Sequence, residues 1–299
     1  MHTTRALLCD AFTDRPLTGN AAGVVPDAAE LSDTQMRAVA RELAVSETAF
    51  VTASDDADRR LRYFSPTTEV DLCGHATIAT HAHLHADGEL EAGSHTVETN
   101  VGVLDVEVEE SGTVWMTQRD PMVRRQPDLD PERVADVLGV EAMAFVDELP
   151  LAVADTGLPF LVVGLDYLST LGDVDPDDDA LRELCADVDA KGVYAFTFDT
   201  LDREASLHGR AFCAPLGIHE DPVTGTASGA VGAYLDHVAA FGGDFPDELV
   251  CEQGHYVDRA GEVRVRVGDA VRVGGTAETS FDGELRVPED DEEDEILEA

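Results

Sequence analysis

Hydrophobic and polar residues alternate through most of the first 120 residues, which is the period expected of β-strands with one buried face. Two segments of this region have a helical pattern instead. One covers residues 32–43, where Ser32 precedes Gln35 by three positions, as in a capping box. The other begins at Gly74 and extends to about His85. The predicted strands cover 5–12, 48–53, 61–65, 95–100, 104–110 and 113–118.

The rest of the chain mixes the same two periods. Residues 119–130 hold two prolines and little periodicity, so this stretch is the predicted linker. It separates a lobe spanning 1–118 from a second lobe spanning 119–287. Eight carboxylates lie in residues 288–299, where we expect a disordered acidic tail. In the second lobe, helices are predicted from Pro131, over 178–187 and from Thr226 to about Val238, with strands near 151–163, 193–198 and 249–286.

Two segments of the chain, 62–84 and 210–235, share an order of residues. Each contains an arginine, a phenylalanine two positions later, a proline, a carboxylate and then Gly-x-Ala-Thr/Ser at the start of a helix rich in small residues. Such short motifs also match by chance. If the similarity reflects a duplication, the chain forms two similar α/β lobes, each with a β-barrel-like sheet around a central helix.

The two predicted helix starts have a composition suited to binding an anion. A helix N-terminus carries unpaired N–H groups and about half a positive charge, and Gly74 and Gly225 would let a ligand approach closely. Beside them, His75 is able to donate to an oxygen or relay a proton, and Asp221 to orient that histidine or hold an amine. The alternatives are that the small residues serve close packing and that His75 is a core histidine.

The charge of the chain excludes several kinds of partner. With 62 acidic and 20 basic residues, the net charge of −42 opposes binding to nucleic acids and to anionic membranes. We interpret the acidity as an adaptation to molar salt, in which dense carboxylates keep the surface hydrated. The chain has no 18-residue apolar run and no basic-then-apolar start typical of a secretory signal, so a cytoplasmic protein is expected.

The cysteines and histidines do not predict a metal site. Five widely spaced cysteines without a C-x-x-C pair argue against disulfides and zinc knuckles. Cys73, directly before Gly74, is either a reactive thiol or a small buried residue. His81 and His85 have zinc-ligand spacing but lack an accompanying glutamate, so we expect them on a helix surface. Residues 173–179 resemble a calcium loop only in composition, and a solvated loop is expected there.

Five stretches of the sequence resemble the PhzF-like phenazine-biosynthesis family in their order and approximate spacing. The similarity extends over nearly the whole chain, to about residue 287. It implies a two-domain fold similar to diaminopimelate epimerase, with the site in the cleft between the domains. The stretches are FTDRPLTGNAAGVV (12–25), SETAFV (46–51), RYFSPTTEVDLCGHATIA (62–79), EDPVTGTASG (220–229) and CEQG (251–254).

The resemblance also implies an activity, namely a cofactor-free isomerisation in which a glutamate moves a proton between carbons. Glu47 occupies the position of that glutamate, although the residues alone leave open whether its carboxylate is solvated. His75 and Asp221 match further polar site residues, and Thr226 stands where a serine is usual, which puts the pocket size in doubt. The residues assigned to substrate binding are Asn20, Ser46, Gly74 and Gly225.

We therefore expect an isomerase acting on a small anionic substrate, without metal or cofactor, and a homodimer as is frequent in the family. Two alternatives remain. A two-base racemase or epimerase would need a cysteine at each helix start, and only Cys73 is so placed, since Cys213 lies eight residues before Asp221. The other is a binding protein that kept the fold and lost the chemistry.

Overall fold

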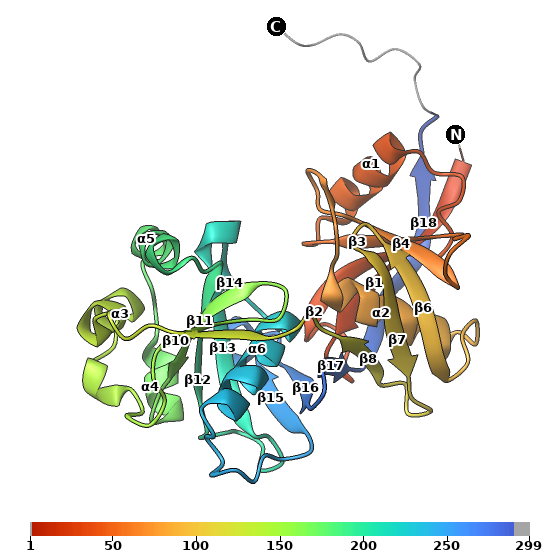
Figure 1. The fold of residues 1–299 in the computed structure, drawn as a ribbon. Helices are drawn as coiled ribbons and strands as arrows, with labels where there is room; N and C mark the ends of the chain where they lie inside the picture. The colour runs from red at the N-terminus through yellow and green to blue at the C-terminus, as the bar shows by residue number, and fades with distance from the viewer. Residues whose placement is uncertain (1, 290–299) are drawn as a thin grey trace, which may run out of the picture. The chain divides into compact units, whose positions relative to one another are not determined.

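The computed structural model describes residues 2–289, and the chain divides into two compact units (Figure 1). Unit 1 comprises the described residues of Met1–Leu17, Ala21–Val114 and Thr276–Ala299. Unit 2 comprises Thr18–Asn20 and Trp115–Gly275. Within residues 2–289, no helix is both long and apolar enough to cross a membrane.

Unit 1 is a strongly interconnected set of strands with two helices. β1 pairs antiparallel with β18, β2 pairs parallel with β3, and β4 pairs antiparallel with β3 and parallel with β6. The strands are β1 (His2–Ala11), β2 (Asn20–Val25, whose first residue falls in unit 2), β3 (Thr48–Thr52), β4 (Arg59–Phe64), β5 (Glu69–Val70), β6 (Gly93–Thr99), β7 (Gly102–Val108) and β18 (Ala277–Val287). The helices are α1 (Asp33–Leu43) and α2 (Gly74–Ala86).

The two helices of unit 1 form for different reasons. α1 is amphipathic and starts at the predicted capping box, in which Ser32 Oγ accepts from Gln35 N at 3.2 Å and Gln35 Oε1 accepts from Ser32 N at 3.0 Å. α2 is enclosed, because residues 76–84 are all buried and the helix contacts β1, β3, β7 and β18. Its small side chains let the surrounding strands approach, as the sequence predicted.

Unit 2 contains one continuous run of strands in the order β9-β10-β11-β12-β13-β15-β16-β17-β8, with β14 beside β13. The strands are β8 (Val114–Thr117, whose first residue falls in unit 1), β9 (Met122–Arg125), β10 (Ala152–Asp155), β11 (Pro159–Gly164), β12 (Gly192–Thr197), β13 (Leu207–Cys213), β14 (Ile218–Asp221), β15 (Leu249–Gln253), β16 (Gly261–Val267) and β17 (Val271–Gly275). The helices are α3 (Pro131–Leu138), α4 (Leu168–Asp173), α5 (Asp178–Val188) and α6 (Gly225–His237), with short 3₁₀ turns at Ala142–Ala144, Ala214–Leu216 and His255–Val257.

The central helix of unit 2 is α6, which repeats the situation of α2. Residues 227–235 are all buried, and the helix contacts β9, β10, β11, β16 and β17. A Cβ added at Gly232 would lie 2.7 Å from Val265 Cγ1, so the glycine permits the close approach of helix and strand. The predicted fold class, α/β with two similar lobes and a central helix in each, is confirmed.

The last strand belongs to a different unit from the one that the sequence indicated. β18 falls within the stretch 119–287 that was assigned to the second lobe, but it pairs with β1 from His2↔Val287 to Ala11↔Ala277 and lies in unit 1. Part of the predicted linker, Met122–Arg125, is a strand paired with β10. Alternation along one strand does not specify its partner, which explains the first difference. Of the predicted acidic tail, 290–299 lie outside the described residues.

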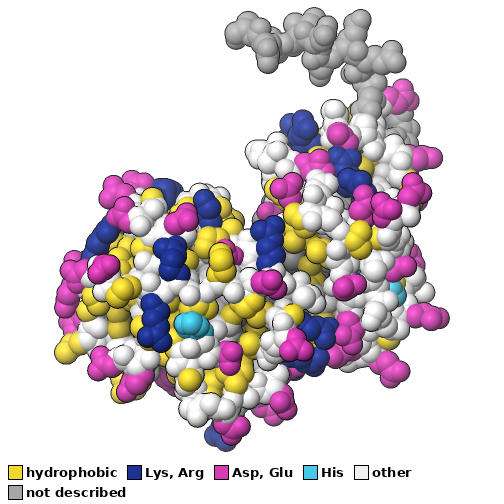
Figure 2. All heavy atoms as spheres, viewed as in Figure 1, with side chains coloured by type: hydrophobic (Ala, Val, Ile, Leu, Met, Phe, Trp, Pro, Cys, Tyr) yellow, Lys and Arg dark blue, Asp and Glu magenta, His cyan; other side chains and the backbone are white. Residues whose placement is uncertain are grey.

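Acidic side chains are spread over the face of each unit that Figure 2 shows, with basic side chains between them. The acidic loop at 173–179 has a structural role, because Asp177 Oδ1 accepts from Asp179 N at 3.1 Å and from Ala180 N at 2.9 Å and so caps α5. Residues 174–177 connect α4 to α5, and Val174 and Pro176 are buried, so the loop is only partly solvated.

Candidate functional site

The shared sequence order corresponds to the same ion pair in both units. In unit 1, Arg62 Nε and Nη2 donate to Glu69 Oε1 and Oε2, both at 2.9 Å, and the guanidinium lies 5.2 Å from the centre of the Phe64 ring. This pair joins β4 to β5, and the residue five positions after the glutamate is Gly74, the first residue of α2. The hydrogen bonds from Arg62 hold the pKa of Glu69 below its usual range.

In unit 2, Arg210 Nε and Nη2 donate to Glu220 Oε1 and Oε2 at 3.0 and 2.7 Å, and the guanidinium lies 4.8 Å from the centre of the Phe212 ring. Gly225 again follows the glutamate by five positions and starts α6. The two central helices also have the same length, 13 residues. The sequence similarity is therefore a structural repeat that places each helix N-terminus directly after a bidentate Arg–Glu pair.

In unit 1, the repeat places four side chains together at the start of α2. His75 Nε2 lies 3.6 Å from Glu47 Oε2 and 3.4 Å from Ser46 Oγ. Cys73 Sγ lies 3.4 Å from His75 Nδ1 and 3.8 Å from Glu47 Oε2. Glu47 precedes β3, whose pairing with β2 is extended by the bond from Gly23 N to Glu47 O at 3.0 Å. The strand start and the helix start thus fix the carboxylate and the imidazole side by side.

This first cluster is partly shielded from water but remains accessible. The side chains of His75 and Glu47 are 14% and 24% exposed, and Cys73 is buried. Among the described residues, the side chain of the N-cap residue Cys73 makes no capping hydrogen bond to α2. The first-turn N–H groups are therefore not occupied by that side chain and can stabilise a negative charge.

In unit 2, the repeat builds a second cluster around Asp221. Its Oδ1 accepts from Asn20 Nδ2 at 3.1 Å, and its Oδ2 accepts a very short bond from Thr224 Oγ1. Gln253 Nε2 donates to Asp221 O at 2.8 Å and to Thr224 Oγ1 at 3.1 Å, while Gln253 Oε1 accepts from Thr224 N at 3.1 Å. Asn20 Nδ2 also donates to Val223 O at 2.8 Å. The carboxylate is therefore held in one orientation.

The start of α6 resembles that of α2 in its available N–H groups. Thr224 is the N-cap residue, but its hydroxyl donates to Asp221, and in the described chain it makes no capping bond to the helix. Thr226, in the first turn, accepts at its backbone oxygen from Thr156 Oγ1 at 3.1 Å. A Cβ added at Gly157 would lie 3.9 Å from the Thr226 methyl, which places that methyl beside a neighbouring loop.

The sequence-predicted residues thus fall into two groups, each local to one unit. The structure brings together Ser46, Glu47, Gly74 and His75 in unit 1, and Asn20, Asp221, Gly225 and Thr226 in unit 2.

Sequence reasoning did not assign a role to Thr224 or Gln253, although Gln253 lies in the CEQG stretch. The signal there is the glycine: Gly254 has φ +84°, and a Cβ added to it would lie 2.3 Å from Arg259 O and 2.6 Å from Pro222 O. Only glycine fits this turn, which presents Gln253 to Asp221.

The two histidines with zinc-ligand spacing are not on the surface as a pair. His81 is fully buried, so the prediction of a helix-surface position is wrong for it, because the sheet encloses α2 on all sides. Its Nδ1 lies 2.8 Å from Thr77 O, and burial lowers its pKa to about 4. His85 Nδ1 lies 2.9 Å from Leu90 O. Both Nδ1 atoms therefore bind backbone carbonyls.

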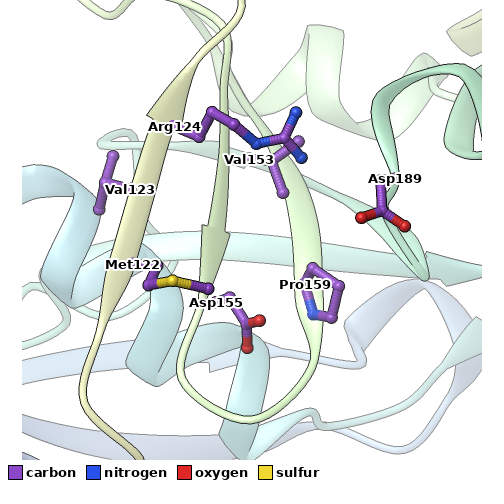
Figure 3. A pocket seen from close by; sticks show the side chains of 7 residues that line it. All are labelled: Met122, Val123, Arg124, Val153, Asp155, Pro159 and Asp189. Atoms are coloured by element: carbon purple, nitrogen blue, oxygen red, sulfur yellow. The ribbon is translucent and has the colours of Figure 1, made fainter.

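A hollow of about 460 Å³ in unit 2 is separate from these clusters (Figure 3). Arg124 Nη2 donates to Val188 O at 2.8 Å, so the charged group on its rim is engaged in the fold. None of the predicted site residues is among the described residues that line it. The lining consists of Met122, Val123, Arg124, Val153, Asp155, Pro159 and Asp189.

The fold is of the diaminopimelate epimerase-like class. A hydroxyproline epimerase from Agrobacterium vitis aligns with a TM-score of 0.59 over 95% of this chain and 91% of its own, and at 13% identity this likeness concerns the fold alone. Within that class, the model of the phenazine biosynthesis-like protein family matches residues 9–283, and the chain belongs to this family.

Relatives within the family agree over almost their whole length. A Bacillus subtilis protein named as an uncharacterized isomerase, YfhB, is 35% identical over 287 residues, which is 95% of this chain and 96% of the relative. The crystal structure of a Bacillus anthracis phenazine biosynthesis protein of the PhzF family has a TM-score of 0.87 and 33% identity, covering 96% of this chain and 100% of that one. The chain is accordingly an isomerase of the PhzF-like family.

Proposed function

We propose that this isomerase moves a proton between carbons of a small carboxylate-bearing substrate, with Glu47 as the acid/base and without a cofactor. The observation that carries the proposal is the cluster of Glu47, His75 and Ser46 at the start of α2. Taking a proton from a weakly acidic C–H group requires a positioned base and fixed donors for the resulting anion. The cluster contains both kinds of group within one partly buried volume.

Glu47 suits the base because its carboxylate is partly buried and its position is fixed by the start of β3. The imidazole of His75, 3.6 Å from that carboxylate, is placed to donate to a substrate oxygen or to relay the proton. The N–H groups at the start of α2 provide a positive potential for the substrate carboxylate or for an enolate-like intermediate.

Within unit 2, we propose that Asp221 and the start of α6 form a polar ligand-binding cluster of their own. Asp221 is held at both carboxylate oxygens by Asn20 and Thr224, so it is oriented to accept from an amine or a hydroxyl. The N–H groups after Gly225 and the hydroxyl of Thr226 are the proposed donors to an oxygen. The Thr226 methyl limits the space there compared with a serine.

Two-base racemisation through a pair of thiols is disfavoured by the residue at the second helix start. Cys73 and Thr224 occupy equivalent N-cap positions, and a threonine cannot act as the second thiol base. Cys213 is buried on β13, and burial raises the pKa of its thiol far above the usual range. One thiol, at Cys73, remains near the cluster.

The cellular setting is also proposed from the sequence. The charge of −42 supports a protein adapted to molar salt, and the family resemblance supports a homodimer. These proposals are tested by the salt dependence of stability and by the molar mass in solution.

The experiment that tests the function is a screen of small amino and hydroxy acids in deuterated buffer at high salt, read by mass spectrometry. A true substrate gains solvent deuterium at carbon with this protein and not with buffer alone. Adding a chelator should leave that exchange intact. Exchange in no member of the set, or exchange that requires an added cofactor, would contradict the proposal.

A further inference from the structure

We propose that Glu47, Cys73 and His75 form a binding site for a soft divalent cation, Zn²⁺ being the test ion, and that its occupation inhibits the enzyme reversibly. Within residues 2–289, this is the only group of three side chains from Cys, His, Asp and Glu whose ligand atoms all lie within 4.8 Å of one another. The three residues come from the two segments that meet at the start of α2.

The spacing of the three atoms fits a metal ion. Cys73 Sγ lies 3.8 Å from both His75 Nε2 and Glu47 Oε2, and those two atoms are 3.6 Å apart. Ligands of a tetrahedral zinc ion, at about 2.0–2.3 Å from the metal, are themselves separated by about 3.3–3.7 Å. In the plane of the three atoms, the equidistant point lies about 2.2 Å from each, and an ion slightly out of that plane has zinc–ligand distances to all three.

The donor set favours zinc over the hard cations of a salt-rich cell. A thiolate and an imidazole bind Zn²⁺ in preference to Mg²⁺ or Ca²⁺, which take oxygen ligands. On binding, the Cys73 S–H bond breaks, the proton goes to solvent and the sulfur electron pair binds the metal. The thiolate and the carboxylate neutralise the charge of the ion, and so offset its repulsion from the positive end of α2.

Three protein ligands leave the fourth tetrahedral position open to water or to substrate. The site is accessible, since the side chains of His75 and Glu47 retain 14% and 24% exposure. A bound ion would hold the lone pair of Glu47 and would attract the substrate carboxylate to an unproductive position. The inhibitory part of the proposal rests on the proposed function of Glu47, whereas the binding part does not.

The binding test uses the full chain after treatment with a chelator. Zn²⁺ should titrate to one ion per chain by calorimetry, and Co²⁺ should give a near-ultraviolet thiolate-to-metal charge-transfer band. Cys73→Ser should abolish that band and weaken Zn²⁺ binding at least about 100-fold, more than the loss typical of an outer-shell partner. His75→Gln and Glu47→Gln should each weaken binding at least about tenfold.

Matched controls come from the same unit. Cys9 is buried on β1, His85 binds a carbonyl and Glu42 is exposed on α1, so Cys9→Ser, His85→Gln and Glu42→Gln should leave the titration unchanged. A measurement on the unmodified protein guards against misfolded variants: Zn²⁺ should protect Cys73 from alkylation, as quantified by peptide mass spectrometry. A site that survives Cys73→Ser, the lack of protection, or equal binding of Mg²⁺ would overturn the proposal.

Inhibition is measured with a substrate that passes the deuterium screen. Zn²⁺ should lower the maximal rate, because it occupies the Glu47 carboxylate, and EDTA should restore that rate. Bound Zn²⁺ without inhibition would overturn the inhibitory part. Loss of activity with EDTA would instead contradict the cofactor-free function while the binding site stood, so the two failures are distinguishable.

Discussion

The buried ion pair of unit 2 should contribute far more to stability than its counterpart in unit 1, and replacing one carboxylate in each tests this. We consider Glu220→Gln and, as the matched variant, Glu69→Gln. Both substitutions keep the size of the side chain and remove its charge. Glu220 is the residue next to Asp221 of the candidate site. A large loss of stability in Glu220→Gln would show that Glu220 has a structural role, unlike its neighbour.

The expected magnitudes follow from the environment of each pair. The side chains of Arg210 and Glu220 are 9% and 4% exposed, and breaking a buried pair by removing one charge costs about 3–5 kcal/mol. Arg210 Nη1 still donates to the carbonyls of Leu171 and Val174, at 3.0 and 2.6 Å, so we expect about 2–4 kcal/mol for Glu220→Gln.

The pair in unit 1 is less costly to break. Arg62 and Glu69 are 17% and 28% exposed, and Arg62 keeps its second partner, Asp33, at 2.6 Å. We expect Glu69→Gln to cost about 1 kcal/mol. In unfolding experiments followed by circular dichroism, Glu220→Gln should lower the midpoint by roughly 5–15 °C, and Glu69→Gln by a few degrees. Equal shifts, or a negligible shift for Glu220→Gln, would refute the reasoning.

Three further predictions concern stability. Gly254→Ala should destabilise by about 2–4 kcal/mol in thermal unfolding, because a Cβ would clash with Pro222 O and the φ of +84° disfavours alanine. Burial lowers the pKa of His81 from 6.5 to about 4, so between pH 6.5 and 4 the folded state binds fewer protons than the unfolded state. The free energy of unfolding should therefore fall by about 3 kcal/mol as the pH drops from 6.5 to 4. His81→Gln should remove this pH dependence from the unfolding curves. Burial tends to raise the pKa of Glu252, but the hydrogen bond with His208 helps hold that pKa below 4.5. The ionised Glu252 therefore stabilises the folded state above pH 4.5, and this stabilisation is lost as the pH falls further. In acid unfolding experiments, Glu252→Gln should not show that loss of stability.

Local sequence signals predicted the parts of the fold that depend on neighbours in the chain. The capping box at Ser32 and Gln35 specifies a helix start by itself, and the glycine and alanine content of both central helices indicated enclosure by strands. The paired motifs predicted two equivalent helix starts because both contain the same order of residues before a Gly-x-Ala segment.

Features that depend on distant partners were not predicted. The alternation of β18 is compatible with many neighbours, and its pairing with β1 closes unit 1 across nearly the full length of the chain. The spacing of two histidines along a helix does not show which side of that helix faces solvent when strands surround it. The position of His81 on the helix surface was therefore wrongly predicted. Gln253 reaches Asp221 only through the turn at Gly254, a contact that no local pattern specifies.

The central claim is that Glu47 carries the transferred proton. The most direct measurement is the rate of solvent deuterium incorporation into an identified substrate by the wild type, Glu47→Gln, Glu47→Asp and the surface control Glu42→Gln. We predict that Glu47→Gln lowers the rate by about 100-fold or more with little change in substrate binding, that Glu47→Asp recovers part of it, and that Glu42→Gln has no effect. Undiminished exchange in Glu47→Gln would contradict the account and make Cys73 the next base to test.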